Sequence, residues 1–231
     1  TVKNPTAACG FTANNHPRPQ RSAKLLFITL EGPEGSGKTT QMTPLAAALR
    51  AAGYDVLTLR EPGGTSISEQ VRAILMNLEN TAMHARTEIL LFLAARAQLV
   101  EEVIRPQLAA GKVVLCDRYI DSTLAYQGFG QGESLATLRS LLDFATGGLR
   151  PDLTILLDIE SRAGIQRKQT SGEWTRMDAF TLAYHQRVRQ GYLDLAAAEP
   201  QRWLKLDAAR PADEVQAELR QVILERLRAR A

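Results

Sequence analysis

Residues 31–40 read EGPEGSGKTT, and this stretch decides the fold of the chain. Its glycines, lysine and threonine match G-x-x-x-x-G-K-[ST], a loop whose backbone N–H groups surround the phosphates of a nucleotide. An apolar run at 25–30 precedes the loop, and a helical pattern from about 39 to 52 follows it. The stretch therefore predicts a phosphate-binding loop between a strand and a helix. The residues expected to surround the phosphates are Gly32, Pro33, Glu34, Gly35, Ser36, Gly37, Lys38, Thr39 and Thr40.

The rest of the chain alternates between short apolar runs and helical patterns. The four further runs are continuous rather than alternating, which indicates strands that are buried on both faces. We therefore predict a three-layer α/β fold of the P-loop NTPase type, with a five-stranded parallel sheet covered by helices on both faces. Pro106 is expected to bend or interrupt one helix. The further strands are expected at 54–59, 112–117, 153–159 and 202–206, and helices at 67–78, 87–110, 135–146, 161–167, 179–198 and 212–228.

Composition favours one domain and gives no sign of a basic binding face. The chain has 231 residues, 45% of them hydrophobic, and a net charge of +3. Four basic residues and no acidic ones lie in 1–24, so the remaining 207 residues carry 24 basic and 25 acidic side chains. We predict a disordered tail at 1–23 and a single domain at 24–231, with no nucleic-acid partner. No apolar block suits a signal peptide or a membrane span, so we expect a cytoplasmic protein without a membrane partner.

Two stretches carry the charged groups expected at the phosphates. Lys38 is expected to reach the β- and γ-phosphates of the nucleotide, and the Thr39 hydroxyl to bind Mg²⁺. Asp117 ends the apolar run 112–117, where an acid can hold the metal through water. Arg118 follows it, at the end of the sheet where such folds bind ligands. The alternatives are a helix or loop cap for Asp117 and a surface ion pair for Arg118.

Five stretches in order carry a resemblance to one family. They are EGPEGSGKTT, REPGGT (60–65), LLFLAARAQL (90–99), DRYIDSTLAYQG (117–128) and RPDLTILLD (150–158). Together they resemble thymidylate kinase, and the resemblance covers essentially all of 25–230. It implies a Mg²⁺-dependent enzyme that converts ATP and dTMP into ADP and dTDP, usually as a homodimer. The alternatives are a P-loop kinase for another nucleotide or nucleoside, or a nucleotide-binding regulator without transfer activity.

The resemblance also implies residues that bind dTMP. Phe92 would stack on thymine and Arg96 would contact the base, although Phe92 also suits an ordinary core position. The carboxylate of Glu34 would bind the 3′-hydroxyl, and its alternative is a solvated loop acid. The remaining expected contacts are Arg60 and Arg118 to the phosphate, with Arg72 either contributing or exposed, Ser122 and Thr123 to the base, Tyr126 beside C2′, and Gln127 to orient the nucleotide.

A polar segment at about 167–177 is predicted to form a mobile lid. The loop 31–40 contains no basic residue besides Lys38, so the resemblance is to the bacterial branch, whose lid supplies positive charge to the transferred group. Arg167, Lys168 and Arg176 are the available bases, and either Arg167 or Arg176 is expected to dominate. Thr175 holds a place where related lids often carry an acid, and the alternative is a solvated basic loop. The turn at 206–211 is expected to contact adenine through its backbone.

Overall fold

The computed structural model describes residues 26–170 and 174–228. The tail predicted at 1–23 and the lid residues 171–173 lie outside the described residues. None of the described helices is both long and apolar enough to cross a membrane.

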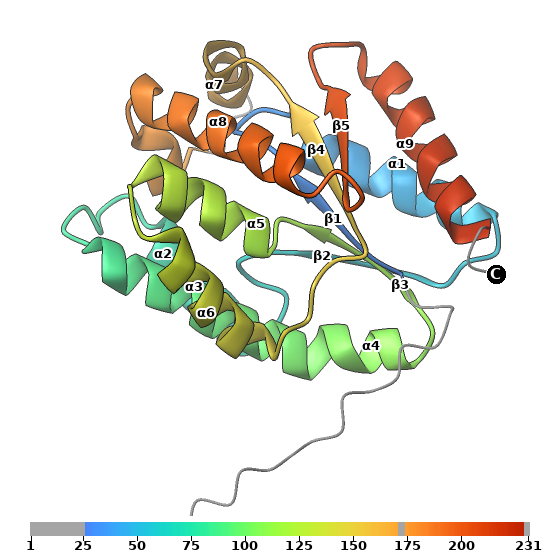
Figure 1. The fold of residues 1–231 in the computed structure, drawn as a ribbon, viewed down its shortest axis with the longest axis horizontal. Helices are drawn as coiled ribbons and strands as arrows, with labels where there is room; N and C mark the ends of the chain where they lie inside the picture. Colours follow the sequence, from blue (N-terminus) through green and yellow to red (C-terminus); the bar gives the residue numbers. More distant parts are fainter. Residues whose placement is uncertain (1–25, 171–173, 229–231) are drawn as a thin grey trace, which may run out of the picture.

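Five parallel strands form the central sheet, as the sequence predicted (Figure 1). The strand order is β2-β3-β1-β4-β5, so the first strand lies in the middle of the sheet. The central strands are buried along nearly their whole length, whereas the edge strands β2 and β5 expose part of theirs, so burial on both faces holds only for the centre. The strands are β1 (Leu26–Glu31), β2 (Val56–Arg60), β3 (Val113–Asp117), β4 (Leu153–Asp158) and β5 (Trp203–Asp207).

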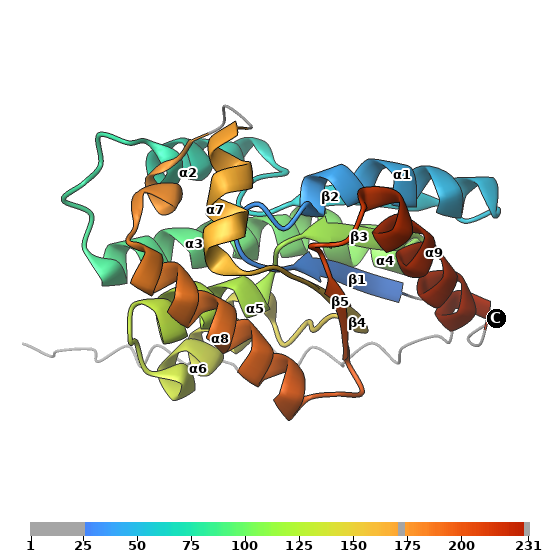
Figure 2. The same ribbon diagram turned by 90° about the horizontal axis from the view of Figure 1, so that it is seen from above.

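Helices cover both faces of this sheet (Figures 1 and 2). On one face, apolar side chains of α1 and α9 pack on β1, β3 and β4. On the other face, side chains of α3, α6 and α8 form a second core around Phe27, Val114 and Leu156. These two cores make the predicted three layers. The helices are α1 (Lys38–Ala51), α2 (Ser66–Met76), α3 (Ala85–Leu99), α4 (Arg105–Ala109), α5 (Ile120–Thr123), α6 (Leu135–Thr146), α7 (Ser161–Thr170), α8 (Leu182–Ala198) and α9 (Ala212–Arg228).

Three shorter helical segments complete the fold. The π-helix η1 (Val100–Ile104) joins α3 to α4, so Pro106, which lacks an N–H, lies where the ordinary helical hydrogen-bond pattern gives way. A second π-helix, η2 (Leu124–Gly130), extends α5, and the 3₁₀ segment η3 (Arg176–Ala179) precedes α8. The helix made by α5 and η2 was not predicted, because its glycines and small polar residues read as a loop.

Candidate active site

A cavity of about 1120 Å³ opens at the carboxyl ends of the strands. Because all five strands are parallel, the loops that follow them meet at this one edge. The phosphate loop lines one side of the cavity, and the segments after β2 and β3 line the other. The described ends of the predicted lid, the turn at 208–211 and the start of α9 complete the lining.

The phosphate loop turns tightly because its glycines adopt conformations that other residues avoid. Gly35 and Gly37 have positive φ values of 67° and 87°. A Cβ on Gly35 would also collide with the backbone of Gly164 in α7. Glycine is therefore required at position 35 both for the turn and for the close packing of the loop on α7.

The ammonium group of Lys38 is held above this loop by atoms of the loop itself. Its Nζ donates to the carbonyl oxygens of Gly32 at 2.9 Å and Pro33 at 3.0 Å, and to Ser36 Oγ at 3.1 Å. Burial, reinforced by the nearby positive charge of Arg118, lowers the pKa of Lys38 to about 8. The charge is thus placed at the centre of an anion-binding loop before any anion enters.

Thr39 and Asp117 form an oxygen pair that fits a divalent cation. The Thr39 hydroxyl donates to Asp117 Oδ2 at 3.1 Å. Mg²⁺ prefers oxygen ligands and keeps several waters, so one hydroxyl and one nearby carboxylate suit it. No group of three or more acidic, histidine or cysteine side chains able to hold a metal occurs within residues 26–170 and 174–228. A cation at this place would therefore depend on water and phosphate oxygens for its remaining ligands.

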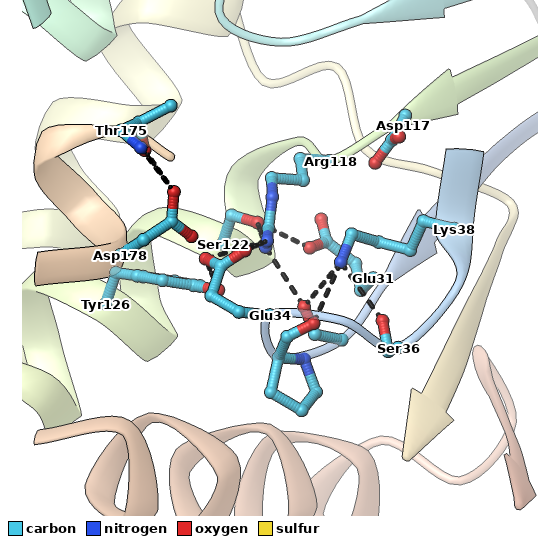
Figure 3. A network of polar contacts seen from close by, with 12 residues as sticks. Glu31, Glu34, Ser36, Lys38, Asp117, Arg118, Ser122, Tyr126, Thr175 and Asp178 are labelled. Atoms are coloured by element: carbon cyan, nitrogen blue, oxygen red, sulfur yellow. Dashed lines mark hydrogen bonds and ion pairs between the residues drawn. The ribbon is translucent and has the colours of Figure 1, made fainter. Parts of the chain in front are cut away.

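Glu34 points away from the phosphate-binding backbone and toward an arginine (Figure 3). Both of its carboxylate oxygens accept hydrogen bonds from Arg118 Nη2 at 3.1 Å, and Tyr126 donates its hydroxyl to Oε1 at 2.6 Å. Burial alone would raise the pKa of Glu34, but the positive charges of Arg118 and Lys38 outweigh it and lower the pKa to about 2. Its side chain is only 14% exposed, so Glu34 is not a solvated loop acid.

Arg118 is fixed by contacts from three other segments. Besides Glu34, its guanidinium donates to Gly32 O at 3.0 Å, Tyr192 Oη at 3.1 Å and Ser122 Oγ at 3.3 Å. Its backbone has a φ of 68°, the one positive value among the described non-glycine residues. Such a conformation is strained for arginine and persists only when surrounding contacts hold it.

Glu31, which was not singled out in the sequence, bonds to the residues around Arg118. Its buried carboxylate accepts the N–H of Tyr119 at 2.7 Å and the hydroxyls of Ser122 at 2.6 Å and Tyr192 at 2.9 Å. Burial, together with the nearby charge of Asp121, raises the pKa of Glu31 to about 7. An acid that ends a largely apolar, fully buried strand was the available signal for Glu31. Tyr192 comes from α8, and no feature of the sequence pointed to it.

On the far side of the cavity, Arg96 is almost fully buried. It donates to Glu61 Oε2 at 2.6 Å, Thr123 Oγ1 at 2.9 Å and Tyr119 O at 3.0 Å. Glu61, the residue after Arg60 in REPGGT, forms a buried pair with Arg96. Phe92, one helical turn before Arg96, is half-buried and lines the cavity together with Thr123.

The two arginines expected near the acceptor phosphate are partly exposed. Arg60 pairs with Glu69 at 3.1 Å, and about half of each side chain is exposed. Arg72 donates to Pro62 O at 3.0 Å, and both arginines line the cavity. Arg72 therefore lies at the cavity and not on a fully exposed face of its helix.

The ends of the predicted lid differ in where their bases lie. Arg167 and Lys168 on α7 line the cavity, and Arg167 donates to Ala208 O at 2.8 Å. Arg176 is absent from the described lining. Its Nε donates to Leu75 O at 3.0 Å and its Nη2 to Glu88 Oε2, with the side chain 10% exposed. Glu88 also was not singled out in the sequence.

Comparison with known proteins gives one consistent family. The family model described as thymidylate kinase matches residues 30–219. The chain is 54% identical over 201 residues to the thymidylate kinase of Deinococcus radiodurans, covering 87% of this chain and 97% of that protein. It is 51% identical over 194 residues to that of Pseudomonas fluorescens, covering 84% and 92%. The crystal structure of thymidylate kinase from Ehrlichia chaffeensis superimposes with a TM-score of 0.70 at 34% identity, covering 86% of this chain and 98% of that chain.

Proposed function

The chain belongs to the thymidylate kinase family, and from this premise we propose that it transfers the γ-phosphoryl group of ATP to dTMP with Mg²⁺, forming ADP and dTDP. One observation carries the proposal. A phosphate loop holding Lys38 and an ionised pair of Glu34 and Arg118 line the same cavity. A donor anion and an acceptor nucleotide can therefore bind side by side.

On the donor side, the loop backbone and Lys38 would bind the phosphates of ATP. Thr39 and Asp117 would hold a Mg²⁺ ion, whose charge offsets that of the β- and γ-phosphates. The acceptor phosphate is already ionised near neutral pH, so positioning and charge neutralisation carry the reaction without a strong general base. Burial of Lys38 keeps its charge close to the phosphates with little competing water.

On the acceptor side, Arg118, Arg60 and Arg72 would bind the phosphate of dTMP. Phe92 would stack on thymine, and Arg96 would contact the base. Three of the five N–H donors of Arg96 are engaged in the contacts above, which leaves donors for a carbonyl oxygen of the base. Glu34 would accept the 3′-hydroxyl, with Tyr126 beside C2′. The contacts assigned to Ser122, Thr123 and Gln127 complete the acceptor site.

We assign the base that neutralises the transferred group to Arg167 rather than Arg176. Arg167 and Lys168 line the cavity, whereas Arg176 is engaged with Glu88. The test is to replace Arg167 by Ala and to measure the turnover number. If turnover stays within about threefold of the wild type, the assignment is wrong, because loss of such a charge costs orders of magnitude in rate.

We also propose a homodimer. Ile67 and Ile74 on α2 and Leu90 on α3 are each about half exposed, on two helices that pack together. Exposed apolar side chains of this size are typical of a surface covered by a partner, here a second copy of the chain. Light scattering on Leu90→Asp should show the monomer mass, and an unchanged dimer mass would contradict the proposed face.

The central experiment is coupled ADP release with a panel of acceptors. We expect kcat/KM to be highest with dTMP, ahead of dUMP, dCMP, AMP and thymidine. Higher efficiency with another acceptor would favour a different nucleotide or nucleoside kinase. Tight ATP binding without formation of dTDP would instead identify a regulator.

A further inference from the structure

Glu88 is a buried carboxylate of α3 that has no part in the proposed chemistry. Only 2% of its side chain is exposed. Its Oε1 accepts hydrogen bonds from Gln127 Nε2 at 2.8 Å and Gln131 Nε2 at 2.7 Å, and its Oε2 accepts from Arg176 Nη2. Three donors from two distant segments thus converge on one side chain.

The donors that meet at Glu88 belong to two segments that line the cavity or flank its lining. Gln127 lies on η2 and lines the cavity. Arg176 begins η3, and its neighbours Thr175, Met177 and Asp178 line the cavity. Glu88 itself lies four residues before Phe92 on α3, so both side chains lie on one face of that helix.

The contacts of Arg176 fix its side chain in one place. Besides Glu88, it donates to Leu75 O in α2 at 3.0 Å. Turning Arg176 toward the donor phosphates would leave the carboxylate of Glu88 buried without its cation, which is strongly unfavourable. The pair therefore anchors the chain beside Arg176 instead of delivering charge.

We infer that Glu88 is a positioning residue for the acceptor: through Arg176 it fixes residues 174–178 as a wall of the dTMP site, and through Gln127 it holds η2 beside that wall. This inference rests on the proposed function, because it concerns how dTMP is held. It assigns Arg176 a place in acceptor binding. Thr175 and Asp178 support the same wall, since the Thr175 N–H and hydroxyl both donate to Asp178 Oδ2 at 2.7 Å.

The test uses the variants Glu88→Gln, which keeps the size of the native side chain, and Arg176→Gln, which removes the charge and shortens the side chain. We expect the KM for dTMP to rise roughly tenfold or more in each, since a charged hydrogen bond is lost in a buried place. The KM for ATP should stay within about twofold, because neither residue contacts the phosphate loop. Arg176→Lys keeps the charge and should recover part of the dTMP affinity.

Arg105→Gln is the matched control. Like Arg176, Arg105 pairs with a glutamate, Glu101, and donates to a carbonyl oxygen at the end of a helix, Thr146 O at 2.7 Å. It is absent from the described lining of the cavity. We expect this variant to lower Tm without changing the KM for dTMP.

The outcomes separate this inference from the proposed function. Absence of dTMP turnover in the wild type would overturn both. Normal wild-type turnover with an unchanged KM for dTMP in Glu88→Gln and Arg176→Gln would overturn the inference alone. An equal rise of KM for ATP and dTMP, or the same rise in Arg105→Gln, would also overturn it, because the pair would then act only through general stability.

Discussion

The donor and acceptor ends of the cavity are built from different kinds of contact. Lys38 is held by partners that lie two to six residues away in the same loop. Arg118 is held by Glu34 and Tyr192, which lie 84 and 74 residues away. The Lys38 loop of the donor end is therefore a local structure, whereas the acceptor end exists only when the sheet and α8 are in place.

This difference explains how a carboxylate can belong to a phosphate loop. The loop binds anions with its backbone, so the side chain of Glu34 is free to leave it. Arg118, from the end of β3, draws that side chain to the acceptor end and keeps it ionised. In the proposed reaction, one short loop would thus contribute its backbone to one substrate and a side chain to the other.

The largest effect is expected from a substitution in the Lys38 loop at the donor end. Lys38→Met removes the ammonium from the phosphate loop, and we expect kcat to fall by about 10²–10³-fold, as for loss of one preorganised charge-stabilising donor. The KM for dTMP should change little, because the contacts of Arg118 remain. Steady-state kinetics measure both quantities, and a fall in kcat of less than tenfold would contradict the role of Lys38.

The next largest effect is expected from a substitution at the acceptor end, whose contacts join residues far apart in the sequence. Glu34→Gln removes the charge that pairs with Arg118, and we expect kcat/KM for dTMP to fall by about 10–100-fold, the range for hydrogen bonds to charged groups. The Kd for ATP, measured by calorimetry, should stay within about twofold. Equal weakening of ATP and dTMP would show that Glu34 acts on the whole loop and that the two ends are not separate.

A pH titration sharpens the comparison at the donor end. Burial lowers the pKa of Lys38 to about 8, so its charge is lost as the pH rises above that value. Since ATP binding favours the charged form, the Kd for ATP should rise by about tenfold between pH 7 and pH 9. Lys38→Arg, which stays charged, should show no such rise. A constant Kd in the wild type would contradict the link to Lys38.

The smallest expected effect removes one support of the acceptor end. Tyr126→Phe deletes the hydroxyl that donates to Glu34 but keeps the ring beside the cavity. We expect the KM for dTMP to rise by about 2–10-fold, the cost of one hydrogen bond. The KM for ATP is the internal control. A change in the KM for ATP alone would show that Tyr126 acts at the donor end of the cavity and not at the acceptor end.

The sequence predicted the class of fold because its signals are local. Continuous apolar runs indicated buried parallel strands, and the pattern at 31–40 indicated a phosphate-binding loop between a strand and a helix. The helix formed by residues 120–130 was missed, since its stability comes from packing against α8 rather than from helix-forming residues. The strand order was likewise not predicted, because it depends on which strands pair.

Among the site residues, the sequence by itself determined those that act through their immediate neighbours. Lys38 and the glycines of its loop are placed by backbone conformation and contacts within a few residues. Only the tertiary structure decided which way charged side chains farther along the chain point. Arg176 looked equivalent to Arg167 in the sequence, but the buried carboxylate of Glu88 draws it away from the cavity lining. The physical reason is that a buried charge needs a partner, and that partner lay 88 residues away.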